Sequence, residues 1–197
     1  HKHCYKGRDM KVESLEKHTE ESICEILDRK YSQLCKYKIP NVFVFASDWE
    51  SDFFMQNNSG YAYEFEIKVS RSDFLNDKKK VKKHSILSTG KFTHTTQTYD
   101  RFDKESNKTI WIESHEEREH NFRPNKFYYV VPEGLVAVDE VPSYAGLMYI
   151  KDFFAEEIKP APFIHKEKLS FESILCNKFY YAWLESKREV LKLKRDN

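Results

Sequence analysis

Apolar side chains recur at helical spacing near the start of the chain and then switch to strand spacing. From about residue 14 to residue 35, leucine and isoleucine fall mostly on one face of a predicted helix, with charged side chains elsewhere. Pro40 and Asn41 end this helical pattern. The apolar run from Val42 to Ala46 predicts a strand that follows the helix.

A hairpin is predicted next. A second short strand lies around Phe53 and Phe54, the turn sequence Asn-Asn-Ser-Gly occupies residues 57–60, and the returning strand covers residues 61–69. Successive side chains of a strand point to opposite faces. One face of the returning strand is therefore apolar and carries Tyr63, Phe65, Ile67 and Val69. The opposite face is charged and carries Glu64, Glu66 and Lys68.

Residues 70–87 return to helical spacing. Ser70 or Ser72 can cap this predicted helix, and Asp73 favours its first turn. The apolar residues of the segment are expected on one side: Phe74, Leu75 and Val81. Three lysines are expected to project from the other side: Lys79, Lys80 and Lys83.

The second half of the chain contains a polar insertion and a resumed core. The insertion covers about residues 88–123, and only residues 109–113 within it resemble a strand. Strands are predicted at residues 127–131 and 145–150, and a last helix at about residues 171–194. Three aromatic residues near the middle of that helix are interpreted as packing residues: Phe179, Tyr180 and Trp183. This order of elements predicts a mixed α/β fold with helices against a central sheet.

Composition adds a local charge signal to this picture. The chain has 197 residues with 40% hydrophobic residues, enough for a folded core, and its formal net charge is only +1. Between Lys68 and Lys91, however, eight Lys or Arg residues face two Asp residues. The overall balance favours neither nucleic acid nor membrane, so any attraction to an anion must come from this local cluster.

The expected location is the cytoplasm. Four cysteines match neither a zinc pattern nor a dense disulfide framework: Cys4, Cys24, Cys35 and Cys176. No apolar run reaches the length of a membrane span, and no leader is recognisable. We therefore expect a soluble intracellular protein that does not engage a membrane.

The charged face of the returning strand is the candidate site. The simplest interpretation is a solvated sheet face with an ion pair between Glu66 and Lys68. However, Asp52 lies on the other arm of the hairpin, where it can face Glu66 across the strands. Two carboxylates suit Mg²⁺ or Mn²⁺, which lowers the pKa of bound water and stabilises charge on a phosphate. Lys68 would orient the attacking water, a role we favour over that of a free base.

The stretches "SDFF" and "EFEIKVSRSDFLND" resemble the PD-(D/E)XK nuclease superfamily, with an acid on one strand and (D/E)-x-K on the next. The closer resemblance, through "EIKVSRSDFL", "KFYYVVPEGL", "YAGLMYI" and "KPAPFIHKEK", is to MmcB-like DNA-repair proteins and their phage relatives. It implies a restriction-endonuclease-like mixed central β-sheet flanked by helices, over residues 14–197. Residues 1–13 would be an N-terminal extension, and the insertion at 88–123 is not explained.

The resemblance also assigns residues. By position it implies a catalytic set of Asp52, Glu66 and Lys68, with the Ile67 backbone carbonyl as a further metal ligand. A glutamate of the first helix sometimes joins such sites; the candidates are Glu21 and Glu25. Glu64 would be a further acid or a partner of a lysine. DNA contacts are expected from Ser70, Arg71, Lys79, Lys80 and Lys83, although the first two can simply cap the helix.

The main hypothesis is a metal-dependent nuclease that hydrolyses DNA in repair, recombination or phage and mobile-element biology, in a bacterial cell or phage-infected host. A homodimer is possible, since cutting both strands often needs two chains. The first alternative is a module on the same fold that binds DNA or recruits a partner without cleavage. The second is a structural or interaction protein in which Glu66 and Lys68 only form an ion pair.

Overall fold

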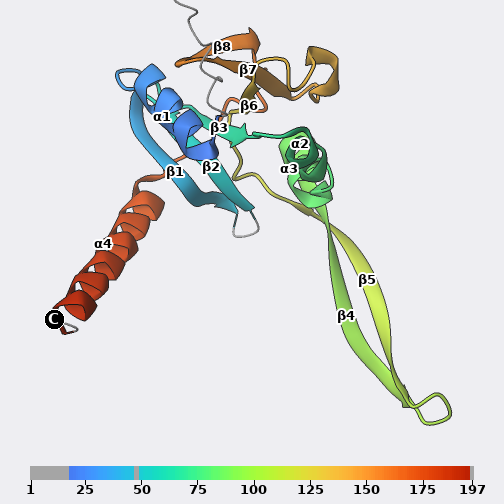
Figure 1. Cartoon of the computed structure of the whole chain (residues 1–197). Helices are drawn as coiled ribbons and strands as arrows, with labels where there is room; N and C mark the ends of the chain where they lie inside the picture. Colours follow the sequence, from blue (N-terminus) through green and yellow to red (C-terminus); the bar gives the residue numbers. More distant parts are fainter. Residues whose placement is uncertain (1–17, 47–48, 196–197) are drawn as a thin grey trace, which may run out of the picture.

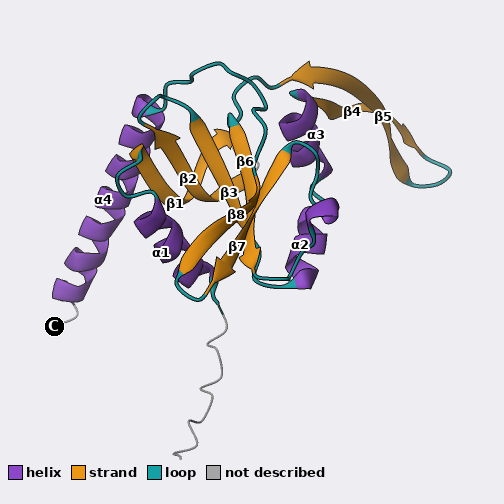
Figure 2. Cartoon of the chain, turned by 90° about the horizontal axis from the view of Figure 1, so that it is seen from above, coloured by secondary structure: helices purple, strands orange, loops and turns teal. Residues whose placement is uncertain are grey.

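The computed structural model describes residues 18–46 and 49–195. A six-stranded mixed sheet has helices on both faces, while a two-stranded arm and the last helix extend from this body (Figures 1 and 2). The prediction of a mixed α/β fold with a central sheet is therefore confirmed. The predicted extension at residues 1–13 and the first residues of the predicted first helix lie outside the described part of the chain.

The main sheet has the strand order β1-β2-β3-β6-β7-β8. Its strands are β1 (Cys35–Ala46), β2 (Trp49–Asn57), β3 (Ala62–Ile67), β6 (Lys126–Pro132), β7 (Ala145–Lys151) and β8 (Phe154–Lys159). β3, β6 and β7 run parallel, and the remaining neighbours pair antiparallel. The helices are α1 (Glu20–Lys30), α2 (Arg71–Asp77), α3 (Val81–Thr89) and α4 (Glu172–Arg195), with a 3₁₀ turn at Val138–Glu140.

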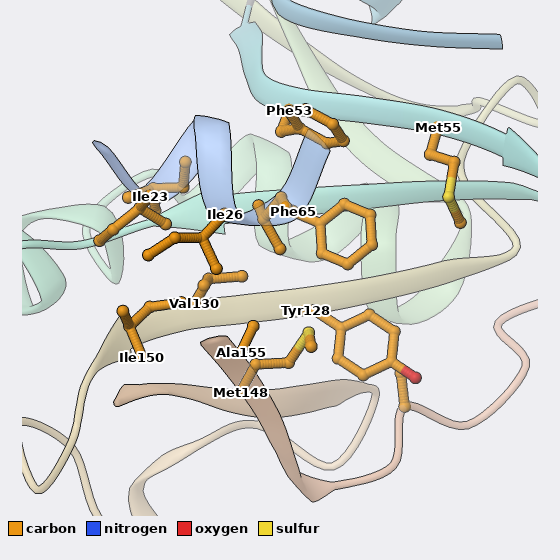
Figure 3. Packing of buried hydrophobic residues seen from close by; sticks show 13 residues of the cluster. Ile23, Ile26, Phe53, Met55, Phe65, Tyr128, Val130, Met148, Ile150 and Ala155 are labelled. Atoms are coloured by element: carbon orange, nitrogen blue, oxygen red, sulfur yellow. The ribbon is translucent and has the colours of Figure 1, made fainter. Parts of the chain in front are cut away.

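Helix α1 covers one face of the sheet. Thr19 caps it through a reciprocal pair of hydrogen bonds with Ser22, which satisfies backbone groups of the first turn. Its buried residues Ile23, Ile26 and Leu27 pack on apolar side chains of β2, β3, β6 and β7 (Figure 3). The expected helix at residues 14–35 is thus shorter at its C-terminal end, where Cys35 already belongs to β1.

The alternation predicted for β3 is present. Phe65 and Ile67 point to the α1 side, while Glu64 and Glu66 point to the side covered by α2 and α3. The hairpin between β2 and β3 is also as predicted, with Gly60 at φ 87 in its turn. The charged face of β3 is not solvated, because Glu64 and Glu66 are both completely buried.

The predicted helix at residues 70–87 is two helices. Backbone turns at Lys78–Lys80 separate α2 from α3, so the helical phase set by Phe74 does not continue into α3. Phe74 is buried as expected, but Leu75 and Val81 are exposed. Lys83 was expected to project outward and is instead 97% buried, since its side chain shares the inward face with Ile86 and Leu87.

The polar insertion forms an antiparallel hairpin of β4 (Lys91–Asp103) and β5 (Lys108–Glu119). The strand predicted at residues 109–113 is confirmed and is longer than expected. Both faces of this arm are largely exposed, and the arm projects far from the main sheet (Figure 1). Strands β6 and β7 match their predicted ranges, whereas β8 was not predicted.

Helix α4 occupies its predicted range, but the interpretation of its aromatic residues was wrong. Phe179, Tyr180 and Trp183 are exposed, because most of the helix extends away from the body (Figure 1). Within residues 18–46 and 49–195, none of the helices combines the length and apolar character needed to cross a membrane.

Candidate functional site

The candidate site lies where β2 and β3 approach α2 and α3. Phe53 pairs with Phe65 across these strands, which places Asp52 beside the end of β3. Asp52 Oδ2 accepts a hydrogen bond of 2.7 Å from the backbone N–H of Ile67. Lys68 follows β3 directly, and its own N–H donates to Val130 O at 3.0 Å. The two strands and β6 therefore fix the backbone on both sides of the site.

Asp52, Glu66 and Lys68 come together as the sequence predicted. Lys68 Nζ lies 2.9 Å from Glu66 Oε1 and 3.5 Å from Asp52 Oδ2, and its side chain is almost fully buried. Burial alone would lower the pKa of Lys68, but the charges of Glu66 and Asp52 outweigh it and raise that pKa. The ammonium therefore stays protonated, which favours an orienting role over that of a base.

Glu66 is held by further lysines. Lys83 Nζ bonds Glu66 Oε2, and Lys80 Nζ lies 3.3 Å from Glu66 Oε1. Lys83 also lies 3.7 Å from Glu64 Oε1, and its ammonium sits over the ring of Phe127. The expectation that Lys83 contacts DNA is therefore wrong, since its charge is enclosed among buried carboxylates and cannot reach a phosphate at the surface.

Asp77 completes this enclosed group and was not identified from the sequence. Tyr129 donates to Asp77 Oδ2 at 2.7 Å, Lys80 lies 3.0 Å from Oδ1, and His84 Nε2 lies 3.3 Å from Oδ2. Burial acts to raise the pKa of Asp77, but the bond with His84 and the charge of Lys83 outweigh it and lower that pKa. Asp77 is thus an anion that holds α2, α3 and β6 together around Glu66.

Glu64 is only partly satisfied by hydrogen bonds. Trp49 Nε1 donates to its Oε1 at 3.0 Å, whereas Oε2 is buried without a hydrogen-bond partner. Burial raises the pKa of Glu64 to about 7, and the charge of Lys83 only partly opposes this. Glu64 therefore acts as an enclosed acid next to Glu66, which fits the structural role considered for it.

Asp52 and Glu66 are suitable ligands for a divalent metal ion. Mg²⁺ in proteins is usually held by one or two carboxylates together with water and substrate phosphate. The pKa of Asp52 is raised to about 6, first by burial and then by the charge of Glu66, and a cation would relieve that repulsion. In the described ranges, no three or more His, Cys, Asp or Glu side chains are grouped to hold a metal.

The other predicted site residues lie apart from the acids. Glu21 and Glu25 are exposed on α1, across the sheet from Glu66, where they line a hollow of about 770 Å³. The structure does not bring either of them to Glu66. Ser70 caps α2 by accepting from Asp73 N at 3.2 Å, and Arg71 forms a forked ion pair with Glu140. Lys79 is exposed and bonds Asn76.

No family model matches the sequence, and a search of curated proteins gave no significant match. Among solved structures, the chain is similar to the SPO1766 protein of unknown function from Silicibacter pomeroyi. The TM-score is 0.50 and the sequence identity is 15%, over 91% of this chain and 93% of that one. At this identity the similarity concerns the fold alone.

Glu64→Gln tests the electrostatic strain in the site. Between pH 4.5 and about 7 the unfolded chain releases this proton while the folded chain retains it, so wild-type stability falls as pH rises through this window. Glutamine keeps an acceptor for Trp49 without the charge. We expect the variant to gain up to about 3 kcal/mol over wild type at pH 8 and little at pH 4.5.

Urea unfolding at several pH values, with a chelator present, measures this difference. The exposed Glu50→Gln on β2 is the matched control and should change stability by no more than about 0.5 kcal/mol. A Glu64→Gln variant that is less stable than wild type at pH 8 would contradict the expected strain.

Proposed function

We propose that this protein is a divalent-metal-dependent nuclease acting on DNA. The observation that carries the proposal is the position of the Lys68 ammonium, bracketed by Asp52 and Glu66 at distances of 3.5 and 2.9 Å. An acid from each of two paired strands beside a charged lysine matches the arrangement implied by the resemblance to PD-(D/E)XK nucleases. DNA as the substrate class rests on that resemblance and on the lysines around residues 78–80.

Each residue of the candidate site has a separate role in this proposal. Asp52 and Glu66, with the Ile67 carbonyl, would hold Mg²⁺ or Mn²⁺, which when bound supplies a water of lowered pKa and a positive charge beside the phosphate. Lys68 donates hydrogen bonds that orient the attacking water and offsets charge developing on the phosphate. Lys83 bonds Glu66 Oε2 and so restrains the rotamer of Glu66.

Asp52→Asn tests the metal site. The amide oxygen can still accept from Ile67 N, so the backbone contact is retained while one ligand charge is lost. We expect the affinity for Mn²⁺, measured by isothermal titration calorimetry, to fall at least about tenfold. Glu25→Gln on α1 is the control and should bind Mn²⁺ like wild type. Wild-type protein without measurable Mn²⁺ binding, or equal binding by Asp52→Asn, would contradict the proposal.

DNA binding without cleavage is the second candidate. It is favoured by one observation: both oxygens of Glu66 are already engaged by lysines, Oε1 by Lys68 and Lys80 and Oε2 by Lys83. A carboxylate neutralised in this way binds a cation less strongly. Cleavage and binding measured on the same DNA substrates separate the two candidates, because a binder retards DNA and leaves it intact.

A further inference from the structure

Helix α4 exposes a series of large apolar side chains among the described residues. It is 24 residues long, about 36 Å, and Leu175 is its one buried residue. Phe179 is 74% exposed, Trp183 48%, Val190 45% and Leu193 65%. Figure 1 shows the helix extending away from the sheet, with none of the other described helices and strands beside its outer half. Exposed apolar surface of this kind marks an interaction site.

The exposed residues form a stripe with coiled-coil spacing. Steps of three and four residues connect the small and apolar positions Leu175, Phe179, Ala182, Ser186, Val190 and Leu193, and Trp183 lies beside Ala182. Only the first of these positions packs on the body, where Leu175 joins a core cluster with Phe54 and Phe171. The stripe is therefore an extension of the core into solvent.

We propose that α4 pairs antiparallel with α4 of a second copy of this chain. The stripe has nearly the same spacing from both ends, as an isologous two-fold contact requires. With the helices antiparallel about a point near Leu184, Phe179 of one copy lies opposite Val190 of the other. The same register places the Ala182 and Trp183 pair opposite Ser186.

The distribution of charged residues along α4 favours antiparallel over parallel pairing. The outer half of α4, residues 186–195, carries five basic residues and one acidic residue: Lys187, Arg188, Glu189, Lys192, Lys194 and Arg195. Parallel helices would place these two basic halves side by side, which is unfavourable. In the antiparallel register Lys178 of one copy lies near Glu189 of the other. The basic outer half of each helix then lies beside the first half of the other helix. This proposal is independent of the nuclease hypothesis.

Sedimentation equilibrium of the full chain tests the pairing, and we expect a dimer at micromolar concentration. Phe179→Glu places two like charges into the stripe and should weaken the dimer at least about 100-fold. Val190→Lys alone should weaken it similarly. The double variant should recover dimerisation, because each new glutamate faces a new lysine only in the antiparallel register. Tyr181→Glu is the matched control, since Tyr181 is exposed on the other side of the helix and should leave the dimer intact.

Three results would overturn the proposal: a monomeric wild type, an unchanged dimer in Phe179→Glu, or no recovery in the double variant. Circular dichroism confirms that each variant is folded, which is expected because the substituted residues are exposed. A monomeric wild type that binds anionic lipid vesicles or duplex DNA through Phe179 would assign the stripe to that ligand and overturn the pairing.

Discussion

Lys68→Met is expected to reduce DNA cleavage at least about 100-fold under conditions where wild type cuts, which is the usual cost of removing one preorganised donor at a site of developing charge. The physical reason is the position of the ammonium between Asp52 and Glu66, with a pKa raised by those two carboxylates. Methionine has a similar length but carries no charge and donates no hydrogen bond.

Plasmid and single-stranded DNA, each with Mg²⁺ or Mn²⁺, are the substrates for this measurement. Lys104→Met is the matched control, because Lys104 is exposed in the turn of the β4–β5 arm, outside the candidate site. Rates are compared per folded molecule, with the folded fraction taken from urea unfolding. If wild type leaves every substrate intact, the nuclease proposal fails for those substrates, and DNA retardation by the same samples would then support the binding module.

Lys83→Met is expected to destabilise the fold by about 3–5 kcal/mol, the usual loss when one partner of a buried ion pair is removed. Lys83 is 3% exposed and faces Glu66, Glu64 and Asp77. Without its charge, the enclosed carboxylates repel each other and remain desolvated. Lys80 can compensate only from the rim, since its own side chain is half exposed.

Urea unfolding measures this loss, and Lys79→Met should change stability by no more than about 0.5 kcal/mol. Combining Lys83→Met with Glu64→Gln should recover part of the loss, because the double variant buries one negative charge fewer. The coupling is read from a double-mutant cycle. A Lys83→Met variant as stable as wild type would mean that the carboxylates take up protons or admit water at no cost.

The period of two in β3 made the core of the site predictable. Alternation along residues 61–69 assigned Phe65 and Ile67 to one face and Glu66 to the other, and the register of the hairpin then brought Asp52 alongside. These inferences needed only the geometry of a strand and the turn at residues 57–60. The mixed sheet followed from the order of apolar segments.

The rest of the site depends on the tertiary structure. The break at Lys78–Lys80 has no proline or glycine to signal it, so the helical phase beyond Phe74 was extrapolated in error. The only sequence feature that indicates an inward position for Lys83 is its spacing of three and four residues from Ile86 and Leu87. The neighbouring lysines favoured the interpretation of this segment as an exposed basic face instead. From the sequence alone, Asp77 is likewise interpreted as a surface acid. Only the tertiary structure places Tyr129 and His84 against its carboxylate.

The base of the β4–β5 arm explains how the protein accommodates a long polar segment. His120 N donates to Gly90 O at 2.6 Å, so the chain leaves and re-enters the body at one point between α3 and β6. His120 Nε2 also contacts Phe45 O at 2.9 Å, which anchors this junction to the edge of the main sheet. Residues can be added in pairs along the arm without altering the register of any strand in the body. Evolution or protein engineering can thus change its length or graft a new loop at residues 104–107 while the domain keeps its architecture.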